Sequence, residues 1–272
     1  MPAKKKHPLY AHELIRPLME ASATINSRRK GLPKGAPLPV TAAEDLVLRS
    51  SSALMRLIAH TAKLEQAVHF LRQKGRTNLR GPTAVQLLCP AGWVEYHLGY
   101  FFALHRSTSD TAQWFVQEVL DLKLPRNLGA GEKFRTEIAK APALFAAFNE
   151  LHNECGKFVN PRNDHLHRGQ YVRSKPVIGR DDYDQLLVAD TLMSLLRKAS
   201  HEHYSAVDHK LVRDKIARWR QALVAALEVT VDDLHQRLAL LLDVLVPVLM
   251  AQIKMAAEQS KRDMGPGKGA MG

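Results

Sequence analysis

Residues 41–74 read TAAEDLVLRSSSALMRLIAHTAKLEQAVHFLRQK and carry the clearest structural pattern in the chain. The first four residues, from Thr41 to Glu44, form a capping box, in which two side chains bind backbone N–H groups at the start of a helix. Apolar residues then recur at helical spacing, and Ser50 and Thr61 fill two steps of the stripe. The stripe consists of Leu46, Leu54, Leu57, Leu64, Val68 and Leu71. A stripe of this length is typical of a helix in a bundle.

Outward from this stretch, the remaining segments also have helical periodicity, and no strand-like alternation of useful length occurs. We expect a first helix over 9–29, a proline- and glycine-rich linker over 31–40, and a pair of helices over 91–105 and 108–122 that turns near Ser107. The last segment is expected to form one very long helix or two consecutive helices, and in the second case the break would fall near Val229-Thr230, where β-branched residues cluster. The other expected helices cover 85–88, 132–139, 142–157, 183–199 and 207–259.

This pattern predicts an all-α protein, an antiparallel helical bundle with long helices and an N-terminal helical arm. The expected organisation is an arm and linker over 1–40, a bundle over 41–260 and a disordered tail over 261–272. Trp93, Tyr96 and Tyr100 recur at helical spacing, which favours a place in the core over a platform for stacking bases.

The composition favours a soluble protein with a polyanionic partner. Hydrophobic residues make up 46% of the 272 residues, and the net charge of +12 suits nucleic acid before membrane. Cys89 and Cys155 have no paired spacing, so no disulfide framework is indicated. No apolar run follows the basic N-terminus, and the run over 238–250 is too short and too interrupted to span a bilayer. We therefore expect a cytoplasmic protein with RNA, and no membrane, as partner.

One short stretch, Asn160-Pro161-Arg162-Asn163-Asp164-His165-Leu166-His167, concentrates the polar chemistry. Asn160 is a good N-cap residue, and proline fits the first helical position. Arg162 and Asn163 would then lie in the first turn, where unpaired N–H groups and the helix dipole favour an anion. His167 follows Asn163 by one turn on the same face. The stretch predicts a phosphodiester-binding site.

The motif Arg-Asn-x-x-x-His, over residues 162–167, resembles the Arg-x4–6-His signature of the HEPN superfamily. Members of this superfamily are helical-bundle proteins. Many members are metal-independent endoribonucleases of toxin–antitoxin, anti-phage and RNA-processing systems. The resemblance implies an endoribonuclease in which the ribose 2′-hydroxyl attacks the phosphate, and a homodimer in which two motifs face one cleft. It also implies tRNA or mRNA as substrate, and an antitoxin or defence-system protein as a further partner.

The residues suggest a division of roles within such a site. His167 is the expected general acid or base, because an imidazole changes its protonation near neutral pH. Arg162 would bind the phosphate and stabilise its developing charge, and Asn163 would hold His167 or the phosphate. Asp164 and His165 are candidates for tuning the pocket. A basic rim for RNA backbone contacts is expected from Arg168, Arg173, Lys175 and Arg180.

Other chemistries have weaker signals. The pairs His165-x-His167 and His201-x-His203, with Asp181, Asp182 and Asp184, could supply metal ligands, but alternate residues of a helix point apart. No His-Glu-x-x-His and no Cys-x-x-Cys occurs, so no metal is expected. No phosphate-binding P-loop and no Gly-x-Ser-x-Gly elbow occurs, and no cofactor is expected. Two alternatives to the nuclease stay open: a non-catalytic RNA- or nucleotide-binding module of the same fold, and a helical subunit of a larger complex.

Overall fold

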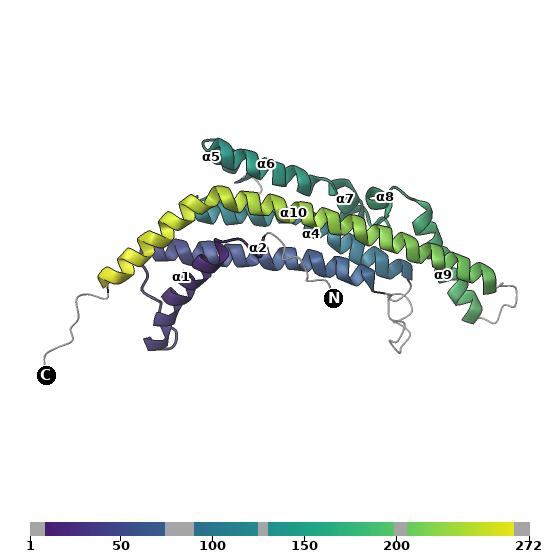
Figure 1. Cartoon of the computed structure of the whole chain (residues 1–272), viewed down its shortest axis with the longest axis horizontal. Coiled ribbons are helices and arrows are strands. Elements are labelled where there is room, and N and C mark those ends of the chain that lie inside the picture. Colours follow the sequence, from purple (N-terminus) through teal and green to yellow (C-terminus); the bar gives the residue numbers. More distant parts are fainter. Residues whose placement is uncertain (1–8, 74–89, 125–129, 199–205, 264–272) are drawn as a thin grey trace. The chain divides into compact units, whose positions relative to one another are not determined.

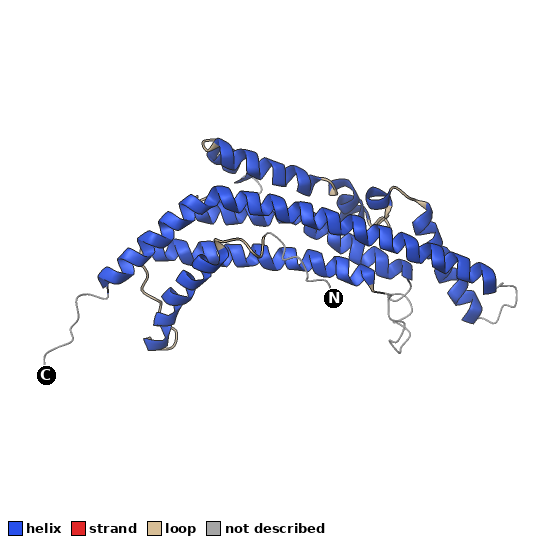
Figure 2. Cartoon of the chain, viewed as in Figure 1, coloured by secondary structure: helices blue, strands red, loops and turns tan. Residues whose placement is uncertain are grey.

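The computed structural model describes residues 9–73, 90–124, 130–198 and 206–263, and these fold into helices joined by loops (Figures 1 and 2). No strand occurs within these ranges, which confirms the expected all-α helical bundle. The expected helix over 85–88, Cys89, the pair His201 and His203, and residues 264–272 of the expected tail lie outside them. The helices are α1 (Ile15–Ser27), the 3₁₀ helix η1 (Arg28–Gly31), α2 (Ala42–Arg72), α4 (Pro90–Val119), α5 (Ala130–Ile138), α6 (Pro142–Gly156), α7 (Val159–Arg168), α8 (Lys175–Ile178), α9 (Asp182–Lys198) and α10 (Ala206–Asp263).

The capping box at the start of α2 is confirmed. The Thr41 N–H donates to Glu44 Oε2 at 3.0 Å, and the Glu44 N–H donates to Thr41 Oγ1 at 3.3 Å. Glu44 is buried, and its carboxylate also accepts a hydrogen bond of 2.8 Å from Arg28 in η1. The box therefore fixes the start of α2 and ties the N-terminal arm to it.

The expected stripe on α2 is buried, except for Leu46, which is half-buried. Both polar positions in the stripe, Ser50 and Thr61, are buried as well. The stripe thus forms the α2 contribution to the core, as its spacing predicts.

The residues cluster into two compact units. The first contains residues 1–59, 109–154 and 234–272, so the residues of the N-terminal arm belong with the first part of α2. The second contains residues 60–108 and 155–233. Each unit therefore takes part of α2, α4 and α10.

In the first unit, Arg49 of α2 contacts Glu118 of α4, and Arg56 lies 4.2 Å over the Trp114 ring. Partner numbers on α4 fall as numbers on α2 rise, so the two helices are antiparallel. The second unit shows the same order, because His60 contacts the Leu104 carbonyl and the Trp93 Nε1–H donates to the Phe70 carbonyl.

The expected turn near Ser107 is wrong, and of the two alternatives for the last segment the structure has the single long helix. Helix α4 continues through Ser107, and α10 continues through Thr230. The Ser107 hydroxyl donates to the Ala103 carbonyl at 2.8 Å, and the Thr230 hydroxyl donates to the Ala226 carbonyl at 3.0 Å. These bonds to the preceding turn satisfy the hydroxyls inside a continuous helix.

The expected core position of three aromatic residues is wrong for two of them. Trp93 is half-buried, but Tyr96 is 63% exposed and Tyr100 is 39% exposed. Helix α4 buries Val94, Leu98, Phe101 and Phe102 in the second unit instead. The two tyrosines therefore lie on the solvent-exposed side of α4.

Helix α10 contains the apolar run over 238–250. By length and composition, α10 over Lys210–Glu258 is apolar enough to cross a membrane: its most apolar 18-residue window has a mean hydropathy of 1.9. A third of that window is buried within the protein. Length and composition alone do not separate a spanning helix from one packed in a bundle.

Candidate functional site

The predicted site lies on α7, which belongs to the second unit. The helix ends at Arg168, and the next residue, Gly169, has a left-handed φ of 61°. The Gln170 N–H donates to the Asp164 carbonyl at 3.0 Å. Glycine adopts this conformation without steric cost, and such an end satisfies the last carbonyls of a helix.

Aromatic packing anchors the start of α7. Phe158 is buried beside α4, stacked on Phe102 at 4.8 Å between ring centroids and edge-on to His105 at 5.0 Å. His105 is itself buried. Burial, with the positive charge of Lys157 as a second cause, lowers the pKa of His105 to about 4. A neutral imidazole therefore completes the apolar socket that holds Phe158.

Close contact with α4 fixes the other end of α7. A Cβ atom added to Gly99 of α4 would lie 2.7 Å from His165 Nε2 and 3.1 Å from Val172 Cγ2. Any larger residue at this position would therefore force the His165 ring to shift. His165, expected to tune the pocket, is thus half-buried against α4, while its Nδ1 lies 3.4 Å from the Gln170 carbonyl.

The expected N-cap role of Asn160 is wrong. The helix begins at Val159, the N-cap position is occupied by Phe158, and no side chain caps it. The Arg162 N–H already donates to the Phe158 carbonyl at 3.0 Å, because the aromatic anchor starts the helix one residue earlier than Asn160. The Arg162 backbone therefore has no N–H left for an anion, and its side chain would have to bind the phosphate.

Arg162 and Asn163 are brought together by the structure. The Arg162 Nη1–H donates to Asn163 Oδ1 at 2.9 Å, and both side chains are half-buried. In the part of the chain that the structure describes, Arg162 Nε is buried without a hydrogen-bond partner, and Arg162 has no carboxylate partner. The guanidinium thus keeps donors and a charge that no neighbouring group uses.

His167 is exposed, and its ring makes no hydrogen bond to any residue in the described ranges. Asn163 lies one turn before His167 on the same face. Its side-chain oxygen, Oδ1, accepts a hydrogen bond from Arg162 and not from His167. The structure therefore places a free imidazole on the helix that carries the arginine, without joining the two by a hydrogen bond.

The four residues of the expected basic rim divide into two pairs. Arg168 donates to Asp164 at 2.9 Å, and Lys175 donates to Asp181 at 2.7 Å, so adjacent carboxylates offset both charges. Arg173 and Arg180 are exposed and form no such ion pair in the described ranges. Asp164 therefore acts on Arg168 and not on the Arg162 guanidinium.

A cavity of about 360 Å³ opens beside this rim, lined by Tyr171, Arg173, Asp181, Asp184, Gln185 and Val188. Burial raises the pKa of Asp184, and hydrogen bonds from Ser174 oppose that shift. The Ser174 N–H lies 3.1 Å from Asp184 Oδ2, which holds the loop before α8 against α9. The sequence pattern singled out Asp184 only as a metal ligand, and its structural role has no local signal.

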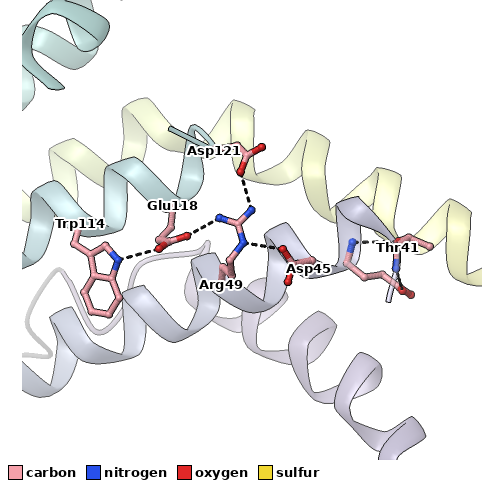
Figure 3. Close-up of polar contacts among 7 residues, drawn as sticks. Thr41, Asp45, Arg49, Trp114, Glu118 and Asp121 are labelled. Atoms are coloured by element: carbon pink, nitrogen blue, oxygen red, sulfur yellow. Dashed lines mark hydrogen bonds and ion pairs between the residues drawn. The ribbon is translucent and has the colours of Figure 1, made fainter. Parts of the chain in front are cut away.

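The first unit contains a larger charged cluster, centred on Arg49 (Figure 3). The three donor groups of Arg49 each bind a different carboxylate, on Asp45, Glu118 and Asp121, at 2.6 to 2.8 Å. Burial lowers the pKa of Arg49, but the hydrogen bonds that it donates to the carboxylates outweigh this effect and give a net upward shift of the pKa. This arginine is fully engaged in joining α2 to the end of α4 and has no free charge for an anion.

In the described ranges, no group of three histidine, cysteine, aspartate or glutamate side chains is arranged to hold a metal ion. Comparison of the chain with protein-family models, with curated proteins and with solved structures found no match.

Proposed function

We propose that this chain is an endoribonuclease of the HEPN type that cleaves RNA without a metal ion, at Arg162, Asn163 and His167. The observation that carries the proposal is the state of two side chains on α7. Arg162 is half-buried and has no carboxylate partner among the described residues, and His167 is exposed with a free ring. A net charge of +12 supports a polyanionic substrate, and tRNA or mRNA is the expected class.

The proposed chemistry uses the substrate's own nucleophile. His167 removes the proton of the ribose 2′-hydroxyl, the 2′-oxygen attacks phosphorus, and the bond from phosphorus to the 5′-oxygen breaks. Arg162 binds the non-bridging oxygens and stabilises their added negative charge, while Asn163 orients its guanidinium. The leaving 5′-oxygen takes up a proton from water. The products are a 2′,3′-cyclic phosphate and a 5′-hydroxyl.

The test is cleavage of end-labelled tRNA and of an unstructured RNA oligonucleotide in EDTA. Arg162→Ala is expected to lower the rate about a hundredfold or more, because one donor to the developing charge is lost. Arg16→Ala, which removes an exposed arginine paired with Glu20 in α1, is the matched control and is expected to cleave normally.

A second candidate function, the RNA-binding module, is favoured by one observation: none of the residues that the structure describes forms a hydrogen bond that orients the His167 ring. RNA binding that Arg162→Ala weakens, with no cleavage by any form, would support the module and exclude the nuclease. Neither binding nor cleavage by the wild type would favour the helical subunit of a larger complex.

We also propose that the chain forms a homodimer through α10. The apolar window of this helix leaves a stripe exposed in the first unit, including Leu240 (52% exposed) and Met255 (47% exposed), with Val248 and Ala251 between them. Residues 240, 248, 251 and 255 lie within about 80° around the helix, so they can face one partner. Contiguous apolar surface of this kind marks an association site.

Sedimentation velocity tests the dimer. The wild type is expected to sediment as a dimer at micromolar concentration, and the double variant Leu240→Glu, Met255→Glu as a monomer. Met55→Glu, which changes an exposed methionine of α2, is the control and should stay dimeric. A monomeric wild type contradicts the proposal, and co-flotation of that monomer with lipid vesicles would assign the stripe to a membrane.

A further inference from the structure

We propose that Tyr96 and Tyr100 of α4 form a platform on which unpaired RNA bases stack beside the α7 site. This inference rests on the proposed function, from which it takes RNA as the ligand. It assigns to the two tyrosines the recognition of single-stranded nucleotides next to the scissile phosphate.

Exposure of the two rings is the first observation. Tyr96 is 63% exposed and Tyr100 is 39% exposed, and they are one turn apart on one helix. Residues four apart are neighbours on a helix surface, about 5–6 Å apart at Cβ. The two rings therefore lie side by side at the surface, which is the arrangement by which proteins bind successive bases of a single strand.

Support beneath Tyr96 is the second observation. The Tyr96 ring lies edge-on to His97 at 5.1 Å between centroids, and His97 in turn lies 4.3 Å from Trp93 and 5.0 Å from Phe70. The Trp93 Nε1–H donates to the Phe70 carbonyl at 3.0 Å, which fixes this aromatic cluster to α2. Burial lowers the pKa of His97, so the support is a neutral ring. The outer ring of the cluster is held in place before any ligand binds.

The position of the platform is the third observation. Gly99, the point at which His165 of α7 meets α4, lies between the two tyrosines in sequence. Around an ideal helix Tyr96 and Tyr100 lie about 60° and 100° from Gly99, both on the same side. The exposed rings thus border the junction of α4 and α7 within the second unit. An RNA strand whose phosphate is held by Arg162 can lay its bases on them.

The alternative occupant of this surface is a protein, because exposed tyrosines also serve protein interfaces. The RNA is favoured because the residues that meet Gly99 are close in sequence to cations: His165 is on the same helix as Arg162, and Val172 directly precedes the exposed Arg173. Stacking is also tolerant of sequence, since every base has an aromatic face.

The test is fluorescence anisotropy with a labelled, unstructured RNA oligonucleotide and full-length protein in EDTA. Removing one stacking ring costs about 1–3 kcal/mol per base, so Tyr96→Ala and Tyr100→Ala should each weaken binding about tenfold, which corresponds to about 1.4 kcal/mol. Tyr96→Phe keeps the ring and should bind normally. Leu211→Ala, which removes an exposed apolar side chain of α10, is the matched control.

A second measurement needs no variant. An oligonucleotide of the same length with abasic sites in place of its central bases keeps every phosphate, and the wild type should bind it about a hundredfold more weakly. Because tyrosine carries no charge, the salt dependence of binding should be the same for Tyr96→Ala and wild type.

The outcomes separate the platform from the nuclease. Tyrosine-dependent binding without cleavage supports the platform and removes the nuclease. Cleavage that needs Arg162, with equal binding of normal and abasic RNA, overturns the platform and leaves the nuclease intact. Absence of RNA binding by the wild type overturns both, and binding of a protein that the two alanine variants lose would assign the surface to that protein.

Discussion

His167→Ala is expected to lower the rate of RNA cleavage by a factor of about a hundred to ten thousand, the contribution of a positioned general acid or base. The effect should fall on kcat, because the imidazole acts on a proton and the phosphate is held by Arg162. Stability should hardly change, since His167 is exposed and its ring has no partner in the described ranges. Surface substitutions of this kind usually shift the unfolding free energy by less than about 0.5 kcal/mol.

The control for this variant is His69→Ala. His69 is an exposed helical histidine of α2, whose Nε2 contacts Gln73 at 2.8 Å, and it has no part in the proposed chemistry. Single-turnover rates with saturating protein separate chemistry from binding. Equal rates for His167→Ala and wild type, with both proteins folded, would remove His167 from the mechanism.

The second large effect is a loss of stability in mild acid, caused by His105. This residue is buried, and its pKa of about 4 in the folded protein lies below the 6.5 of an exposed histidine. Below pH 6.5 the unfolded chain therefore binds a proton that the folded protein does not. Stability is full above pH 6.5 and falls as the pH drops towards 4, by about 3 kcal/mol in all.

Urea unfolding at pH 7, 6 and 5 measures this effect, with His105→Gln as the comparison. The variant cannot titrate at this position, so its stability should fall less steeply between pH 7 and 5 than that of the wild type. The slopes are compared, because the substitution also disturbs the rings of Phe101 and Phe158 around His105. Parallel slopes in the two proteins would mean that His105 takes up its proton in the folded state.

The sequence predicts most of the fold because the information is local. Helix α2 illustrates this. The capping box predicts where the helix starts, and the apolar stripe predicts which side of it is buried. Both signals depend only on residues three or four apart, which are neighbours in any helix. The helix can therefore be predicted without knowing which segments pack against it.

Continuity of the long helices could not be predicted in the same way. Ser107 and Thr230 are residues that often leave helices, and here each donates its hydroxyl to the preceding turn. Burial of neighbouring apolar residues on both sides of each position stabilises the uninterrupted helix, and that contribution comes from other segments of the chain. The intrinsic helix propensity of one residue is small compared with this stabilisation by packing.

The sequence identifies candidate residues for the site, but it does not show which of their side chains contact one another. The pattern identified Arg162, Asn163 and His167, and the structure joins only the first two. The role of Phe158 depends on a socket made by Phe102 and His105, more than fifty positions earlier, so no local signal shows that the helix begins before Asn160. The exposure of Tyr96 and Tyr100 likewise depends on which side of α4 other helices cover.

Analysis of the ends of the RNA fragments tests the central claim most directly. Purified wild-type protein is incubated with RNA in EDTA, and the termini are identified by mass spectrometry. The proposed chemistry predicts a 2′,3′-cyclic phosphate on one fragment and a 5′-hydroxyl on the other, both absent with Arg162→Ala. Intact RNA, or fragments that end in a 3′-hydroxyl and a 5′-phosphate, would contradict it.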